Sequence, residues 1–360
     1  PSRPEPKQAY NSEMNFEEKI ICAFQVLKKK MAWNGRYQLY SKELEKVIKK
    51  GSGSNADLNF ILISILKDFG LEAYPVVMSR RSSGMLPYNF PSLQKLNTFF
   101  VAIHDINKQK YVFLDSSMDV PAFNILPLEL SVNKARMLSL KEKEEKKWVN
   151  VMALSHNKSF MKIDARIEGN QVKGHRSTVL YGQEAIEYQA NENHKQDNLV
   201  SNPENKVSQK EKLTVTNLKV KKQENDWALI EEEFDFVLQA DRTDDHLYIN
   251  PMLFPQLKSN PFIQTERVLP IEFPYPYKFT MLSTLTLPEG YEVEETPQPQ
   301  LIRTQGDGLQ CKYMIQRQGN TISLNYIFYL KEPIFLTEQY KQLQELWTKV
   351  IEKNNEGRSA

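Results

Sequence analysis

The segment 56–66 constrains the fold of this chain more than any other, because it is apolar on nearly every side. The glycine-serine stretch 51–54 precedes it and predicts a turn, and Gly70 follows it at a position suited to ending a helix. A helix that is apolar all round has no face to offer to water, so it must be buried. We therefore expect a buried helix here, with the first domain packed around it.

The segments on either side of this helix complete an α+β pattern. Upstream, residues 16–27 carry apolar side chains at helical spacing after the capping residue Asn15, and residues 41–50 predict a second, short helix. Downstream, β-branched and aromatic runs separated by polar turns predict strands at 73–78, 99–103 and 111–114. Helices followed by an antiparallel sheet predict a domain of the α+β class.

A second domain follows the charged run 141–147, which is typical of a solvated linker or helix surface. We place the boundary at the end of this run, so that the two domains span 1–147 and 148–360. Beyond it, apolar and polar residues alternate, as in 161–167 and 322–330, and predict half-buried strands. Turn residues between such strands favour an antiparallel β-sandwich.

Three segments of the second domain lead to further predictions. Residues 191–212 are polar and predict a long loop. The proline-aromatic cluster 273–277 is either an exposed recognition patch or an edge strand interrupted by prolines, and we favour the edge strand. The apolar residues of 336–350 recur at helical spacing after Thr337, a suitable cap, and predict a terminal helix that packs on the sheet.

Composition excludes several functional classes. Hydrophobic residues make up 40% of the chain, and no apolar run reaches the roughly 18 residues that a membrane-spanning helix needs. The net charge of +2 provides no field for binding nucleic acid. Cys22 and Cys311 fall in different predicted domains, which argues against a disulfide or a cysteine-based metal site, and Cys22 lies within an amphipathic helix, where a thiol is usually buried. His104-Asp105 has no second ligand at a suitable spacing, so we expect neither a metal nor a cofactor.

The first half carries a specific motif string. It reads Gly53-Ser54-Asn55-Ala56-Asp57, a buried helix, Gly70-Leu71-Glu72-Ala73, a strand, then Asn97-Thr98 and Leu114-Asp115-Ser116. This string resembles the transglutaminase-like superfamily, which has a papain-like fold and writes Gly-x-Cys-x-Asp, Asn-His and Leu-Asp-Pro at these places. The resemblance covers roughly residues 16–130. It implies a cysteine-proteinase-type domain in which a helix N-terminus, two strands and their side chains assemble a Cys-His-Asp triad.

Carried over position by position, the resemblance places Asn55 at the nucleophile, Thr98 at the base and Asp115 at the orienting carboxylate. An amide cannot form a thioester, and a threonine hydroxyl is not a base near neutral pH, so thiol acyl transfer through these residues is excluded. A shift of one residue at the turn would bring Ser54 or Ser52 to the nucleophile position, still without a base. Asp115 is either a relic with a new role or a carboxylate that caps the turn at 116–117.

Other residues fall where the family has its cleft. Trp33 lies in the region that lines the cleft near the oxyanion hole, although core packing explains a tryptophan there equally well. Ser54, Asp57 and Asn97 are the remaining candidates for cleft residues. The second half, with motifs such as Tyr248-Ile249-Asn250-Pro251 and Leu287-Pro288-Glu289-Gly290-Tyr291, resembles an uncharacterised β-domain that follows such cores in Bacteroidetes-type exported proteins.

This resemblance implies a location outside the cytoplasm, and because the chain begins at Pro1 we expect any signal peptide to lie outside it. We expect a non-catalytic module that binds or scaffolds a peptide, protein or glycan. The alternatives are a hydrolase or peptidase with Ser54 or Ser52 as nucleophile, and a purely structural spacer. An open cleft at Asn55, Thr98 and Asp115 would favour binding, and a filled one would favour structure. The sequence leaves the oligomeric state open.

Overall fold

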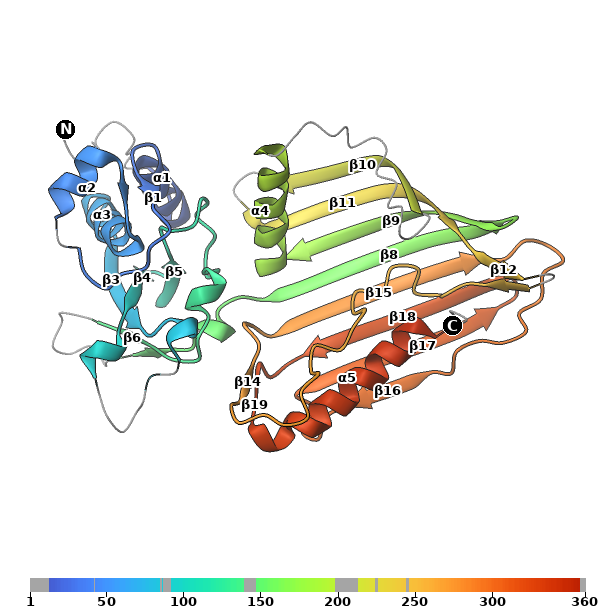
Figure 1. Cartoon of the computed structure of the whole chain (residues 1–360). Helices are drawn as coiled ribbons and strands as arrows, with labels where there is room; N and C mark the ends of the chain where they lie inside the picture. The colour runs from blue at the N-terminus through green and yellow to red at the C-terminus, as the bar shows by residue number, and fades with distance from the viewer. Residues whose placement is uncertain are drawn as a thin grey trace. The chain divides into compact units, whose positions relative to one another are not determined.

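Helix α3 (Asn55–Asp68) is the centre of the first half, as its apolar sequence predicts. Most of its side chains are buried, and Gly70 adopts a left-handed backbone with φ of +73° just beyond its end. The computed structural model describes residues 13–41, 43–84, 86, 92–138, 147–197, 213–223, 226–243 and 246–356, with the backbone alone for 191–197. The chain divides into two compact units, residues 1–155 and 156–360 (Figure 1).

The first unit is a five-stranded sheet with helices packed on one face. Helix α1 (Phe16–Lys28) is capped by Asn15, as predicted, and the Asn15 side chain also forms a capping box with Glu18. The short helix α2 (Leu44–Lys50) follows, and a small parallel pair, β1 (Ala32–Trp33) and β2 (Ser52–Gly53), leads into α3. The sheet has the order β5-β4-β3-β6-β7. Its strands are β3 (Glu72–Met78), β4 (Thr98–Asp105), β5 (Lys110–Leu114), β6 (Ala135–Met137) and β7 (Trp148–Val149).

Both faces of this sheet are buried, which explains why its central strands read as continuous apolar runs. Val77, Phe99 and Val101 pack with the helices α1 and α3 in one hydrophobic cluster. Val76 and Phe100 face the other way and pack against the segment 126–137 in a second cluster. Strand β4 is therefore clamped from both sides, and this clamp fixes the position of its first residue, Thr98.

The boundary between the units lies eight residues later than we expected, at 155 rather than 147. Strand β7 pairs with β6, and the amide of Val151 donates to Val132 O at 2.9 Å. These contacts tie residues 148–153 to the first unit. Of the charged run on which we based the boundary, residues 141–146 lie outside the described part of the chain.

The second unit is built on one eight-stranded sheet of order β10-β11-β9-β8-β15-β18-β17-β16. Neighbouring strands are antiparallel except for β8 and β15, which are parallel. Its strands are β8 (Asn157–Glu168), β9 (Gln171–Tyr181), β10 (Leu213–Gln223), β11 (Asp226–Gln239), β15 (Tyr277–Thr286), β16 (Gln300–Arg303), β17 (Leu309–Gln318) and β18 (Thr321–Leu330). The smaller pairs are β12 (Asp241–Thr243) with β13 (His246–Tyr248), and β14 (Ile271–Glu272) with β19 (Ile334–Phe335).

This single sheet replaces the two facing sheets of the β-sandwich that we expected. The alternation that predicted half-buried strands is correct, since Met161, Ile163, Ala165 and Ile167 are all buried. Their cover, however, is helix α5 (Tyr340–Asn355) together with the segment 252–271, rather than a second sheet. Alternation reports that one face of a strand is buried but says nothing about what buries it. The coarse class, α+β with a C-terminal helix, stands.

Three local predictions need correction. The cluster 273–277 is not an edge strand: Pro274 and Pro276 precede β15, which lies between β8 and β18, so the prolines fall just before the ladder begins. Helix α4 (Gln183–Asp197) occupies the start of the expected loop, and residues 198–212 lie outside the described part. Thr337 opens a short 3-10 turn, and α5 starts at Tyr340.

None of the described helices is long and apolar enough to cross a membrane.

Candidate functional site

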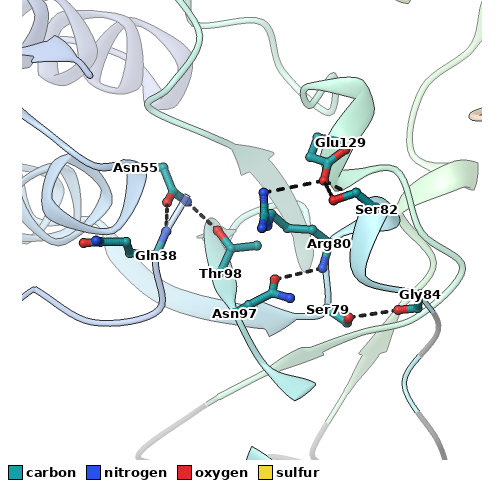
Figure 2. Close-up of polar contacts among 9 residues, drawn as sticks. All are labelled: Gln38, Asn55, Ser79, Arg80, Ser82, Gly84, Asn97, Thr98 and Glu129. Atoms are coloured by element: carbon teal, nitrogen blue, oxygen red, sulfur yellow. Dashed lines mark hydrogen bonds and ion pairs between the residues drawn. The ribbon is translucent and has the colours of Figure 1, made fainter. Parts of the chain in front are cut away.

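The side chain of Asn55 is enclosed and fully hydrogen-bonded. Its Nδ2 donates to Thr98 Oγ1 at 2.6 Å and to Phe99 O at 3.1 Å, and its Oδ1 accepts from the amide of Gln38 at 2.9 Å (Figure 2). The Asn55 amide also donates to Arg36 O at 3.1 Å. With an exposed fraction of 0%, this side chain has no contact with solvent. Two donors and one acceptor thus bind protein atoms, where a nucleophile would face a cleft.

Asp115 is joined to this centre by Asn59, a residue that we did not select from the sequence. Asn59 Nδ2 donates to Asp115 Oδ2 and to Phe99 O, both at 2.8 Å. Asn59 Oδ1 accepts from the amide of Ser116 at 2.9 Å and from its hydroxyl at 2.5 Å. The amide and hydroxyl of Ser117 both donate to Asp115 Oδ1. Asn55 and Asn59 stand four residues apart on one face of α3, and this spacing in an otherwise apolar helix was the available signal.

The three positions that the sequence resemblance assigned to a triad therefore converge, but on a filled polar network. Asn55, Asn59 and Thr98 are 0% exposed, and Asp115 is 1% exposed. Burial raises the pKa of Asp115, and hydrogen bonds from Ser117 and Asn59 oppose that rise. We call this set of residues (55, 59, 98 and 115–117) the polar network. From the sequence we expected a filled cleft at Asn55, Thr98 and Asp115 to favour a structural role. The closure of the polar network therefore favours a structural role for these residues over ligand binding.

Ser54 and Asp57, expected in the cleft, form the N-terminal cap of α3. Ser54 Oγ donates to Asp57 Oδ2 at 2.7 Å, and the Ser54 amide donates to the same oxygen at 2.8 Å. The Asp57 amide donates back to Ser54 Oγ at 3.3 Å, which completes a capping box. Both side chains are buried. The Ser54 hydroxyl, a candidate nucleophile from the sequence, is thus hydrogen-bonded within a helix cap. Ser52, the other candidate, lies in the β1–β2 pair.

The histidine of the first unit, His104, does not lie near the Ser54 hydroxyl. His104 is at the far end of β4 from Thr98, where it pairs in register with Glu72. Its ring stacks on Tyr111 at a centroid distance of 4.7 Å, and its Nδ1 lies 3.4 Å from Glu72 Oε2. Among the described residues, no group of three or more His, Cys, Asp or Glu side chains could hold a metal ion.

A half-buried rim lies next to the polar network. The rings of Trp33 and Tyr37 are 5.2 Å apart, and the guanidinium of Arg80 lies 5.5 Å from the Tyr37 ring. Arg80 Nη1 is 3.6 Å from Glu129 Oε1 (Figure 2). Asn97 Oδ1 accepts from the Arg80 amide at 2.9 Å, so Asn97 holds the rim rather than faces a ligand. Burial raises the pKa of Tyr37 to about 12.

The rim residues (33, 37, 80 and 129) come from three segments that are far apart in the sequence. We selected Trp33 and Asn97 from the sequence but not Tyr37, Arg80 or Glu129. Ser82 adds to the rim, because its amide and hydroxyl both donate to Glu129 Oε1. No spacing rule brings these residues together, since only the fold places them side by side.

A second surface feature lies on the other unit. An open groove of roughly 550 Å³ runs over β8, β9, β11 and β15 on the sheet face opposite α5. Its charged side chains already pair with one another or with neighbours: His175 with Asp235 at 2.8 Å, and Arg166 with Glu168 at 2.5 Å. Such exposed pairs are typical of a solvated strand face.

Comparison with known proteins gives one family match and one similar solved structure. Residues 245–357 match the model of a family described as a domain of unknown function with solved structure, DUF3858. The fold resembles the crystal structure of a "putative protease" from Parabacteroides distasonis, with a TM-score of 0.50, 12% identity and coverage of 97% of this chain. The match covers 53% of that protein, so this chain spans about half its length. No curated protein matches the chain. At this identity the likeness is one of fold, and the second half holds a domain of unknown function.

Proposed function

We propose that this chain is a non-catalytic relative of the transglutaminase-like fold that acts as a scaffolding module outside the cytoplasm. The observation that carries the proposal is the polar network. Asn55 and Thr98 hydrogen-bond to each other at 2.6 Å at the positions where the family has a nucleophile and its base. The glycine turn, the capped helix and the carboxylate at 115 are all kept around them.

No side chain in or beside the polar network can act as a catalytic nucleophile. A nucleophile needs a base within hydrogen-bonding reach and access to substrate. Ser54 has neither, since its hydroxyl is 1% exposed and bonded to Asp57. The serine-hydrolase alternative that the sequence left open therefore receives no support from the geometry.

Because the polar network is closed to solvent, any ligand would have to bind at the surface of the unit. The expected ligand classes, peptide, protein or glycan, cannot reach Asn55 or Asp115. The rim can be reached, because the side chains of Arg80 and Glu129 are 29% and 30% exposed. Aromatic and arginine side chains are the types that dominate protein–protein contacts. A protein partner docked on the rim is thus the form of scaffolding that the residues favour.

The lack of catalysis is testable with a panel of amide and ester substrates and a fluorophosphonate probe. Wild type and Asp115→Ala should give the same background rates, and Ser54 should stay unlabelled by mass spectrometry. Asp115→Asn, which keeps the volume, serves if the alanine variant does not fold. Hydrolysis above background that depends on Asp115, or a labelled Ser54, would overturn the proposal.

The scaffolding role calls for a cross-linking pull-down from native envelope extract with the full-length protein. A partner that is captured by wild type, lost with Arg80→Ala and retained with Lys29→Ala, an exposed control just after α1, would support the rim. Equal capture by all three proteins would contradict binding at the rim, and capture by none of them would favour the spacer hypothesis. Fractionation of native cells tests the location, and recovery in the cytoplasm alone would contradict it.

A further inference from the structure

Helix α4 begins where β9 ends and is pinned at its start by two hydrogen bonds. The amide of Gly182 donates to Ala228 O at 2.8 Å, and the amide of Gln183 donates to Asn157 Oδ1 at 2.8 Å. Further along, the Tyr188 hydroxyl donates to Glu232 Oε2 at 2.7 Å. Glu232 shares a face of β11 with the buried Phe234 and Phe236, so α4 lies on the same side of the sheet as α5 (Figure 1).

The face of α4 turned to the sheet carries two carboxyl groups. Glu184 and Glu187 stand one helical turn apart, and both interact with the side chain of Tyr275, just before β15. Tyr277, at the start of β15, has its hydroxyl 2.6 Å from Ser159 Oγ. The cluster therefore consists of two acids and two phenols, packed against the end of the sheet.

No positive charge balances this acid pair in the described residues. Arg176 on β9 pairs with Glu232 of β11 at 2.5 Å. Lys158 on β8 lies over the Tyr181 ring at 4.4 Å, while His156 before β8 and Asp226 at the start of β11 are exposed. No cationic side chain in the described residues acts on the pKa of either carboxyl, and Glu187 Oε1 is buried without a hydrogen-bond partner.

A buried carboxylate oxygen without a partner is costly when charged, and much less so when protonated. Burial raises the pKa of Glu187, and burial together with the charge of Glu187 raises that of Glu184. The undocked groups would titrate near the ordinary value of 4.5. Since the docked state holds protons more tightly, its advantage is complete below that value and is lost as pH rises through the raised pKa.

We propose that the first two turns of α4 form an acid-locked clasp on the end of the eight-stranded sheet. The clasp is docked while Glu184 and Glu187 carry their protons beside Tyr275, and it loosens when both are ionised. The chain thus contains a helix whose attachment to its sheet depends on the acidity of its surroundings.

Hydrogen–deuterium exchange of the full chain tests the clasp at about pH 4.5 and about pH 8, with correction for intrinsic rates. Amides of 183–190 should lose about tenfold in protection at the higher pH, because ionisation of the two acids removes the advantage of the docked state. In the same samples β15 should keep its protection. The double variant Glu184→Gln and Glu187→Gln should hold 183–190 protected at both values. Glu289→Gln, an exposed control, should behave as wild type.

Equal protection of 183–190 in wild type at both pH values would overturn the clasp, as would a loss that β15 shares in parallel. A glutamine double variant with the same pH dependence as wild type would overturn it too. The wild-type comparison stands on its own if the double variant does not fold.

Discussion

The polar network of the first unit is buried and the acid cluster under α4 is partly buried, and the two differ in how their polar atoms are satisfied. Around Asn55 and Asn59 each side-chain amide has partners for its donors and its acceptor. Under α4, Glu187 leaves one buried oxygen without a partner. A fully satisfied network fixes one arrangement, whereas an unsatisfied charge makes an element sensitive to its surroundings. Burial alone therefore does not distinguish a rigid polar core from a labile contact.

The largest expected effect comes from breaking the polar network at its bridge. Asn59→Leu keeps the volume but removes the Asn59 partner of Asp115 Oδ2 and of the Ser116 amide, and it leaves Phe99 O with Asn55 as its remaining side-chain donor. Several buried groups left unsatisfied should lower the free energy of unfolding of the first unit by about 3 to 5 kcal/mol. Urea denaturation measures this, with the exposed Asn107→Ala as a control expected within about 0.5 kcal/mol of wild type. A loss below about 1 kcal/mol for Asn59→Leu would show that the network is not what holds this unit.

The next effect concerns the one acid in the network. Asp115 has a raised pKa, so its contribution to stability is complete below its ordinary value of 3.8 and is lost as pH rises through the raised pKa. Asp115→Asn should remove this part of the pH dependence. It should also cost about 1 to 3 kcal/mol, because an amide NH₂ there would face the donors of Asn59 or Ser117. Denaturation curves between about pH 3 and about pH 8 check both points. An unchanged pH profile would mean that Asp115 does not titrate within the folded range.

A smaller effect is expected at the cap of α3. Ser54→Ala removes the hydroxyl that accepts from the Asp57 amide and should cost about 1 kcal/mol. Ser54→Thr, which keeps a capping hydroxyl, should recover most of this loss. Thermal unfolding of both variants measures the difference. If Ser54→Ala instead left stability intact and abolished a hydrolytic activity, the cap interpretation would be wrong.

For the first unit, the sequence predicted the helices and strands better than the buried polar contacts between them. The buried helix, the cap at Asn15 and strands β3 to β5 all follow from local spacing and turn residues. The convergence of Asn55, Thr98 and Asp115 came from the motif resemblance, and the structure brings them together. Asn59 escaped selection because an amide in an apolar helix has no motif of its own.

The sequence could not indicate which elements pack on the buried face of the second sheet. The second unit was expected to bury its strands against another sheet, but Trp347 and Phe262 come from a helix and a connecting segment. Likewise the acid pair at Glu184 and Glu187 reads as an ordinary helix surface until Tyr275 is placed beside it. Period-two alternation and helical spacing specify a buried face without identifying its partner, so such sites appear only in three dimensions.

The smallest expected effect separates the rim from the network it adjoins. Glu129→Gln removes the ion pair with Arg80 at 3.6 Å, between side chains that are each about one third exposed. Pairs of this kind contribute at most about 1 kcal/mol, so unfolding should change by less than about 0.5 kcal/mol. The hydrogen bond between Ser82 and the residue at 129 can survive through the amide oxygen. If urea denaturation showed a loss as large as that of Asn59→Leu, the rim would belong to the same rigid core, and its proposed freedom to meet a partner would fail.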